Sequence, residues 1–176
     1  HGVPANTINR LCGSSLDAII QAARAIWSGD AEVIIAGGVE SMSRAPYSVA
    51  KNQSGTFGNV TAFDTALGWR YPNPKMEKMF PLESMGETAE NVAEKYKIGR
   101  AEQDEFALAS HEKAVTAQTA GKFSEEVIPV QIPGKKAVTT VANDEGPRAD
   151  TTLERLGGLQ PVFRKGGTVT PGNSSS

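Results

Sequence analysis

The first 36 residues carry the pattern that most restricts the fold of this chain. Apolar residues recur every three or four positions over residues 14 to 28, which predicts an amphipathic helix that Gly29 ends. Residues 6 to 10 and 32 to 36 have the character of strands, and the second is a short unalternating apolar run of the kind buried on both faces. Strand, helix and strand in this order predict a βαβ unit with a right-handed crossover. The predicted fold class is therefore α/β.

Cys12 is the only cysteine, and it lies where the first predicted strand passes into the helix. Ligands gather at the carboxyl ends of strands in α/β sheets, and the free N–H groups of a helix N-terminus favour a thiolate. The small neighbours Gly13, Ser14 and Ser15 leave room for a substrate and leave N–H groups free to hold an oxyanion. Free cysteines usually pack in cores, however. Placement alone leaves both a nucleophile and a packing residue open.

The rest of the chain predicts further helices and strands. Ser84 and Glu87 have the spacing of a capping box, which predicts a helix start. The predicted elements are, in order, an ordered loop over residues 43–83, helices over about 84–96 and 101–120, strands within 125–132 and 136–142 joined through Pro133-Gly134, and a short helix with Thr151 as a cap. In the first of these helices, the residues predicted to share a buried face are Met85, Ala89, Val92, Ala93 and Tyr96.

Composition excludes several classes of function. Eighteen basic and 20 acidic residues give a net charge of -2, which provides no field to attract nucleic acid or an anionic membrane. A lone cysteine cannot form an internal disulfide, which favours a reducing compartment and predicts a cytoplasmic protein. No paired cysteines, HxxxH motif or carboxylate cluster predicts a metal site, and Gly37-Gly38 lacks the GxGxxG pattern of dinucleotide binding. His111 is expected on an exposed helix face.

Several stretches, in order along the chain, resemble the thiolases, enzymes that make or cleave 3-ketoacyl-coenzyme A. They are NRLCGSSLDAIIQAARAIWSGDAEVIIAGGVESMSRAPY, SMGETAENVAEKY, QDEFALASHEKA, FSEEVIPV, DEGPRADTTLERL and FRKGGTVTPGNSSS. The resemblance implies an incomplete thiolase-like fold. Residues 1–42 would be part of the amino-terminal core, residues 43–160 an α+β loop domain that covers coenzyme A, and residues 161–176 a return to the core. GWRYPNPKM resembles the degradative acyltransferase and 3-oxoadipyl-CoA branch more than the short-chain biosynthetic branch.

The resemblance also assigns roles to single residues. Cys12 would be the acyl-accepting nucleophile, with its own backbone N–H as one oxyanion donor. Ser84 and Met85 match positions beside the pantetheine arm of coenzyme A. Arg148 matches a position near the nucleotide end, and Ser175 one near the amide groups of the coenzyme. Coenzyme A or acyl-CoA would be a substrate, with no permanently bound cofactor and no metal.

These binding residues also have purely structural interpretations. Ser84 is explained by its capping role, Arg148 by a solvated surface and Ser175 by a frayed terminus. The family often has a histidine at the position of Ser84 and alanines at those of Pro171 and Ser174.

Family members also use a later histidine and a second cysteine, and this sequence contains neither motif. These 176 residues are therefore expected to be a fragment that completes no catalytic cycle alone. The expected function is that of a thiolase-type acyltransferase on acyl-CoA, whose parent protein is a homodimer or homotetramer. Two alternatives stay open: a non-catalytic coenzyme A-binding module, and a condensing enzyme of the ketoacyl synthase type, against which SMGETAENVA and GTVTPGN argue.

Overall fold

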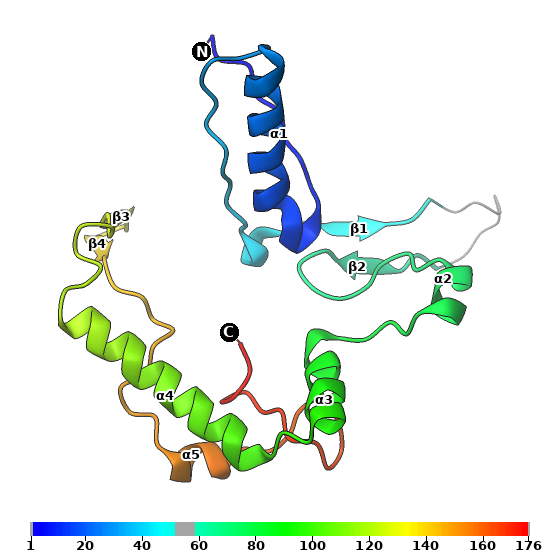
Figure 1. Ribbon diagram of the computed structural model, residues 1–176, viewed down its shortest axis with the longest axis vertical. Helices are drawn as coiled ribbons and strands as arrows, with labels where there is room; N and C mark the ends of the chain where they lie inside the picture. The colour runs from blue at the N-terminus through cyan, green and yellow to red at the C-terminus, as the bar shows by residue number, and fades with distance from the viewer. Residues whose placement is uncertain (1, 52–58, 176) are drawn as a thin grey trace. The chain divides into compact units, whose positions relative to one another are not determined.

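The chain, described by a computed structural model over residues 2–51 and 59–175, divides into two compact units. The first unit spans residues 1–72 and the second spans residues 73–176 (Figure 1). The predicted division into three parts, at residues 42 and 160, does not coincide with the boundary between these two units, and it stays a prediction.

The first unit is built around one long helix. Helix α1 (Ser14–Ser28) follows a turn of 3₁₀ helix, η1 (Leu11–Gly13). Gly29 ends α1 in the left-handed conformation, with φ of 80°. The helix predicted from the apolar period is therefore confirmed at both ends.

The two strands predicted beside α1 are not formed. Residues 2–10 and 31–41 are irregular, and no described segment pairs with them. A strand is defined by the hydrogen bonds of its neighbour, so an apolar run without a described partner stays unpaired. Val33 and Ile35, predicted to be buried on both faces, are 84% and 98% exposed.

The region predicted to be an ordered loop contains more regular structure than expected. It holds η2 (Met42–Arg44) and the antiparallel pair β1 (Tyr47–Val49) and β2 (Ala62–Asp64). The ring of Phe63 meets that of Tyr71 edge-on, with centroids 4.9 Å apart, and the Tyr71 hydroxyl lies 2.7 Å from that of Ser48. An aromatic pair therefore stabilises this small sheet.

The second unit contains the remaining elements. They are α2 (Pro74–Met79), α3 (Met85–Tyr96), α4 (Arg100–Thr119), the antiparallel pair β3 (Val130–Pro133) and β4 (Val138–Val141), and α5 (Leu153–Gly157), labelled in Figure 1. All but the first were predicted, and α2 lies in the stretch predicted to be loop. The turn between β3 and β4 is closed by Gly134 N–H, which donates to Ala137 O at 3.0 Å. Thr152, and not Thr151 as predicted, caps α5 by accepting from Arg155 N–H.

The buried residues of the second unit form a small and half-polar core. They are Gly86, Ala93, Leu156 and Val169 together with Glu90, Asp104 and Thr170. The buried face of α3 differs from the predicted one, since Met85 is 81% exposed and Tyr96 65% exposed. Of the predicted face only Ala93 is buried, and the other buried residues of α3 are Gly86 and Glu90.

Gly86 explains why the face of α3 that carries it is the buried one. A Cβ added at Gly86 would lie 2.3 Å from the ring of Phe163, so only glycine lets the ring approach α3. The periodicity of apolar residues did not reveal this contact, because the buried residues of α3 are small or charged.

Candidate functional site

The thiol of Cys12 is free and exposed. Cys12 is the central residue of η1, directly ahead of the first turn of α1. The predicted place at a helix N-terminus is therefore confirmed. An exposed thiol is accessible to a substrate, whereas the packing interpretation requires a buried one.

The backbone around Cys12 is held in an unusual conformation. Leu11 has φ of 51°, a region that residues with a Cβ adopt at a cost of about 1–3 kcal/mol. Side chains on both sides hold the turn. Leu11 N–H donates to Asn9 Oδ1 at 2.9 Å, and the Ser14 hydroxyl accepts from Arg10 N–H at 2.8 Å while it donates to Leu11 O at 2.7 Å. The turn that presents the thiol is thus fixed by local hydrogen bonds.

Ser84 and Met85 lie together at the start of α3. The Ser84 hydroxyl accepts from Glu87 N–H at 3.2 Å, which confirms its predicted capping role. Both residues are exposed. Their predicted contact with the pantetheine arm stays a prediction.

Arg148 lies in the loop between β4 and α5. Its backbone N–H donates to Nδ1 of His111 at 3.1 Å, and its side-chain Nε lies 3.6 Å from Asp150 Oδ1. Asp150 also pairs with Arg155 at 2.5 Å, and this hydrogen bond holds the pKa of the Asp150 carboxyl below its usual value. The Arg148 side chain is 70% exposed, so most of its guanidinium is open to an anionic ligand.

His111 differs from its predicted role. It was expected on an exposed face, but it is half-buried and accepts the Arg148 hydrogen bond. The partner lies 37 positions along the chain, so neighbouring residues gave no sign of it.

Ser175 is exposed at the end of a segment that is well held up to Ser174. The Ser174 hydroxyl donates to Thr170 O at 2.8 Å, and Asn173 Oδ1 accepts from Thr170 N–H at 2.8 Å. The predicted fraying of the terminus is therefore absent from the residues just before Ser175.

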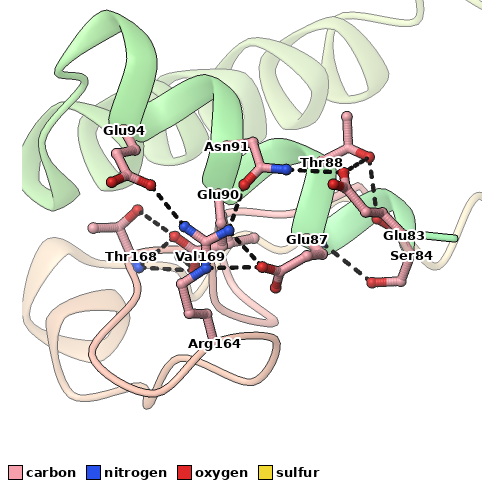
Figure 2. Close-up of polar contacts among 10 residues, drawn as sticks. All are labelled: Glu83, Ser84, Glu87, Thr88, Glu90, Asn91, Glu94, Arg164, Thr168 and Val169. Atoms are coloured by element: carbon pink, nitrogen blue, oxygen red, sulfur yellow. Dashed lines mark hydrogen bonds and ion pairs between the residues drawn. The ribbon is translucent and has the colours of Figure 1, made fainter. Parts of the chain in front are cut away.

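Two charged residues that the sequence did not single out connect this segment to α3. Arg164 donates to Glu87 through Nε at 2.8 Å and to Glu94 through Nη1 at 3.0 Å, and it also donates to Asn91 (Figure 2). Glu90 accepts from the backbone N–H groups of Thr168 and Val169. A signal for Glu90 was present, because Gly86 and Ala93 place small residues one turn before and after it.

The charge state of Glu90 follows from these contacts. Burial raises the pKa of the Glu90 carboxyl, but the N–H groups of Thr168 and Val169, the Thr168 hydroxyl and the charge of Arg164 together lower it below its usual value. Glu90 is 3% exposed, so a carboxylate is kept ionised inside the second unit.

The structure brings some of the predicted residues together and leaves others apart. Ser84 and Met85 share one helix start, and the Arg164–Glu87 pair links that helix start to the segment that leads to Ser175. No hydrogen bond or ion pair of the described residues joins Arg148 to these residues. Nor do any three His, Cys, Asp or Glu side chains in the described ranges gather as a metal site would require. None of the described helices is long and apolar enough to span a membrane.

Comparison with known proteins gives a consistent result. The family model "Thiolase, N-terminal domain" matches residues 1–176. The chain is 54% identical over 175 residues to the β-ketoadipyl-CoA thiolase of Acinetobacter baylyi, which covers 98% of this chain and 43% of that protein. It is 52% identical over 174 residues to the 3-oxoadipyl-CoA/3-oxo-5,6-dehydrosuberyl-CoA thiolase of Escherichia coli, with the same coverage.

Solved structures also match nearly the whole of this chain. Human mitochondrial 3-ketoacyl-CoA thiolase matches with a TM-score of 0.79 and 41% identity, over 95% of this chain and 41% of that one. The acetyl-CoA acetyltransferase of Bacillus anthracis matches with a TM-score of 0.77 and 42% identity, over 96% and 41%. The chain thus spans less than half the length of the relatives it matches, and the predicted partial thiolase-like α/β fold is confirmed. Since the family match extends over the whole sequence, this chain belongs to the thiolase family, through the N-terminal domain of that family.

Proposed function

We propose that this chain is the nucleophile-bearing part of a thiolase-type acyltransferase. The single observation that carries the proposal is the free, exposed thiol of Cys12 at the N-terminus of α1, in a chain that matches the thiolase N-terminal domain throughout. In the proposed step the Cys12 thiolate attacks the thioester carbonyl of an acyl-CoA. A bond forms between Sγ and the carbonyl carbon, the coenzyme A sulfur leaves with the electron pair of the broken C–S bond and takes a proton, and the acyl group stays on Cys12.

Coenzyme A is proposed to contact Ser84, Met85, Arg148 and Ser175. The helix start of α3 carries the first two, and the largely exposed guanidinium of Arg148 suits phosphate or adenine. Relatives above 50% identity are named for 3-oxoadipyl-CoA (β-ketoadipyl-CoA), which favours an acyl chain that ends in a free carboxylate. A coenzyme A-binding module without chemistry is the alternative, and a ketoacyl synthase-type enzyme is disfavoured by the family match.

Acyl capture without turnover is the expected behaviour of these 176 residues. In thiolases, which these residues resemble, a later histidine and a second cysteine complete the catalytic cycle. When catalytic groups act as a unit, the absence of one removes most of the reaction rate. A cytoplasmic, homo-oligomeric parent protein that binds neither nucleic acid nor membranes is also part of the proposal.

Intact-mass measurement after incubation with acetyl-CoA tests the proposal. We expect one acetyl group on the wild-type chain and none on Cys12→Ser. A matched control moves the thiol to the other end of the same helix, in the double variant Cys12→Ser/Ser28→Cys, because Ser28 is also exposed. Acylation of the moved thiol at an equal rate would contradict a role for the helix N-terminus. A wild-type thiol inert to both acetyl-CoA and iodoacetamide would contradict the nucleophile itself.

A further inference from the structure

The residues from Thr168 to Ser175, here called the terminal segment, carry no helix or strand. Val169 and Thr170 within it are nevertheless 4% and 0% exposed. Buried backbone N–H groups without a sheet neighbour need other acceptors. Glu90 on α3 accepts from Val169 N–H, and Asn173, which is held by Asp104 on α4, accepts from Thr170 N–H.

Glu90 on α3 is the first of these acceptors. Both of its carboxylate oxygens lie 2.9 Å from Thr168 N, and Oε1 also accepts from Val169 N–H at 2.8 Å (Figure 2). The Thr168 hydroxyl adds a bond of 3.2 Å. Two consecutive residues of the terminal segment are therefore fixed to one buried carboxylate.

The space around this carboxylate is tight. A Cβ added at Gly167 would lie 2.2 Å from Glu90 Oε1, so the chain can approach the carboxylate only through a glycine. Gln103 Nε2 donates to the Thr168 hydroxyl at 2.9 Å and so holds the same residue from α4.

Asp104 on α4 is the second acceptor, and it acts through Asn173. Asp104 Oδ1 accepts from Asn173 Nδ2 at 2.9 Å, which leaves Asn173 Oδ1 to accept from Thr170 N–H. A carboxylate can only accept, so Asp104 decides which way the amide of Asn173 points. Asp104 is itself 4% exposed and paired with Arg100 at 2.8 Å.

We infer that Glu90 and Asp104 are positioning residues for coenzyme A: they hold the terminal segment so that Ser175, two residues beyond Asn173, meets the coenzyme at a fixed place. This inference rests on the proposed function, because it takes Ser175 as a coenzyme contact. It adds that two buried carboxylates far from the thiol in sequence set the affinity for coenzyme A.

The test uses the full chain with Glu90→Gln and coenzyme A itself as the probe. Glutamine keeps the size of the side chain but removes its charge, and it puts an N–H donor in place of Oε2, which lies 2.9 Å from Thr168 N and accepts from the Thr168 hydroxyl. We expect the dissociation constant for coenzyme A to rise about tenfold, and amide-exchange protection of the terminal segment to fall, while the helices stay formed by circular dichroism. Asp104→Asn should act in the same direction. The matched control is Glu94→Gln, the same change on α3 at a side chain that is 78% exposed, and it should change the affinity less than about twofold.

A double-variant cycle with Ser175→Ala separates positioning from general stabilisation. If Glu90 acts through Ser175, the double variant binds coenzyme A no more weakly than whichever single variant has the lower affinity. If the two residues act independently, their losses of binding free energy add. Additive losses, or an unchanged affinity in Glu90→Gln while Ser175→Ala binds weakly, would overturn the inference and leave the proposed function standing. Wild-type affinity in Ser175→Ala, or no coenzyme A binding by the unaltered chain, would overturn the proposed coenzyme site and the inference with it.

Discussion

In the first unit no described residue is buried, whereas the second unit buries Glu90, Asp104 and Thr170 beside three apolar residues. The first unit holds its proposed nucleophile through short-range contacts, such as those of Asn9 and Ser14 around Cys12. The second joins positions up to 79 residues apart through hydrogen bonds to side chains. The turn around the thiol is therefore held by local contacts, whereas the segment that leads to Ser175 is held by long-range ones.

Among substitutions in the second unit, Asp104→Ala is expected to have the largest effect. It removes the carboxylate that accepts from both Arg100 and Asn173, whose side-chain N–H groups keep their bonds to backbone carbonyls. Removing one partner of a buried pair costs about 3–5 kcal/mol, so we expect a large loss of exchange protection in α4 and the terminal segment. Trp27 and Trp69 both lie in the first unit, and their fluorescence should not change.

Glu105→Ala is the control for this prediction, because it removes a neighbouring carboxylate that is exposed. A change of less than about 0.5 kcal/mol is expected. Equal losses in the two variants would mean that the buried carboxylate has no special part in the second unit.

Gly86→Ala is expected to have the next largest effect. The added methyl group would collide with the Phe163 ring, and overpacking of this kind costs about 1–3 kcal/mol. Gly157→Ala is its control, since that helical position has nothing within 4 Å of an added Cβ and alanine should stabilise α5 by up to about 1 kcal/mol. Urea unfolding followed by circular dichroism measures both. A Gly86→Ala chain as stable as the wild type would mean that Phe163 is free to leave α3.

Acidification should destabilise the second unit before it affects the first. The pKa of Glu90 lies below its usual value of 4.5, so its contribution to stability is complete above that value and is lost as the pH falls through the lowered pKa. Glu90→Gln should be less stable at neutral pH and should lose less stability on acidification. Unfolding midpoints between neutral and acid pH measure this, and parallel pH profiles for variant and wild type would contradict it.

The smallest effect on stability is expected for a substitution in the first unit. Trp27 on α1 is 83% exposed, so Trp27→Ala should change the free energy of unfolding by less than about 0.5 kcal/mol. Amide exchange in α1 measures it. A larger loss would show that the apolar face of α1 is covered in solution.

Sequence reasoning succeeded where the determining contacts are local. The apolar period and Gly29 predicted α1, and Ser84 with Glu87 predicted the start of α3, because caps and helical faces lie within a few residues. It failed for the strands at 6–10 and 32–36, since a strand depends on a partner that no local pattern names.

The candidate site divides in the same way. The place of Cys12 at the N-terminus of α1 could be predicted, because a lone cysteine before a helix is visible in a dozen residues. Arg164 and Asp104 could not, since Arg164 meets α3 and Asp104 meets Asn173 across 69 to 77 positions. The small neighbours of Glu90 were a signal, but its partners lie 78 and 79 positions away. The buried face of α3 was wrong for this reason.

The left-handed backbone of Leu11, one residue before the thiol, sets a limit on improving this chain. A glycine there would relax the turn and raise stability, yet it would also let the sulfur sample many orientations. Stability and a fixed orientation of the sulfur are therefore in competition at a single position, and a variant selected only for heat resistance would be expected to hold the Cys12 thiol less precisely.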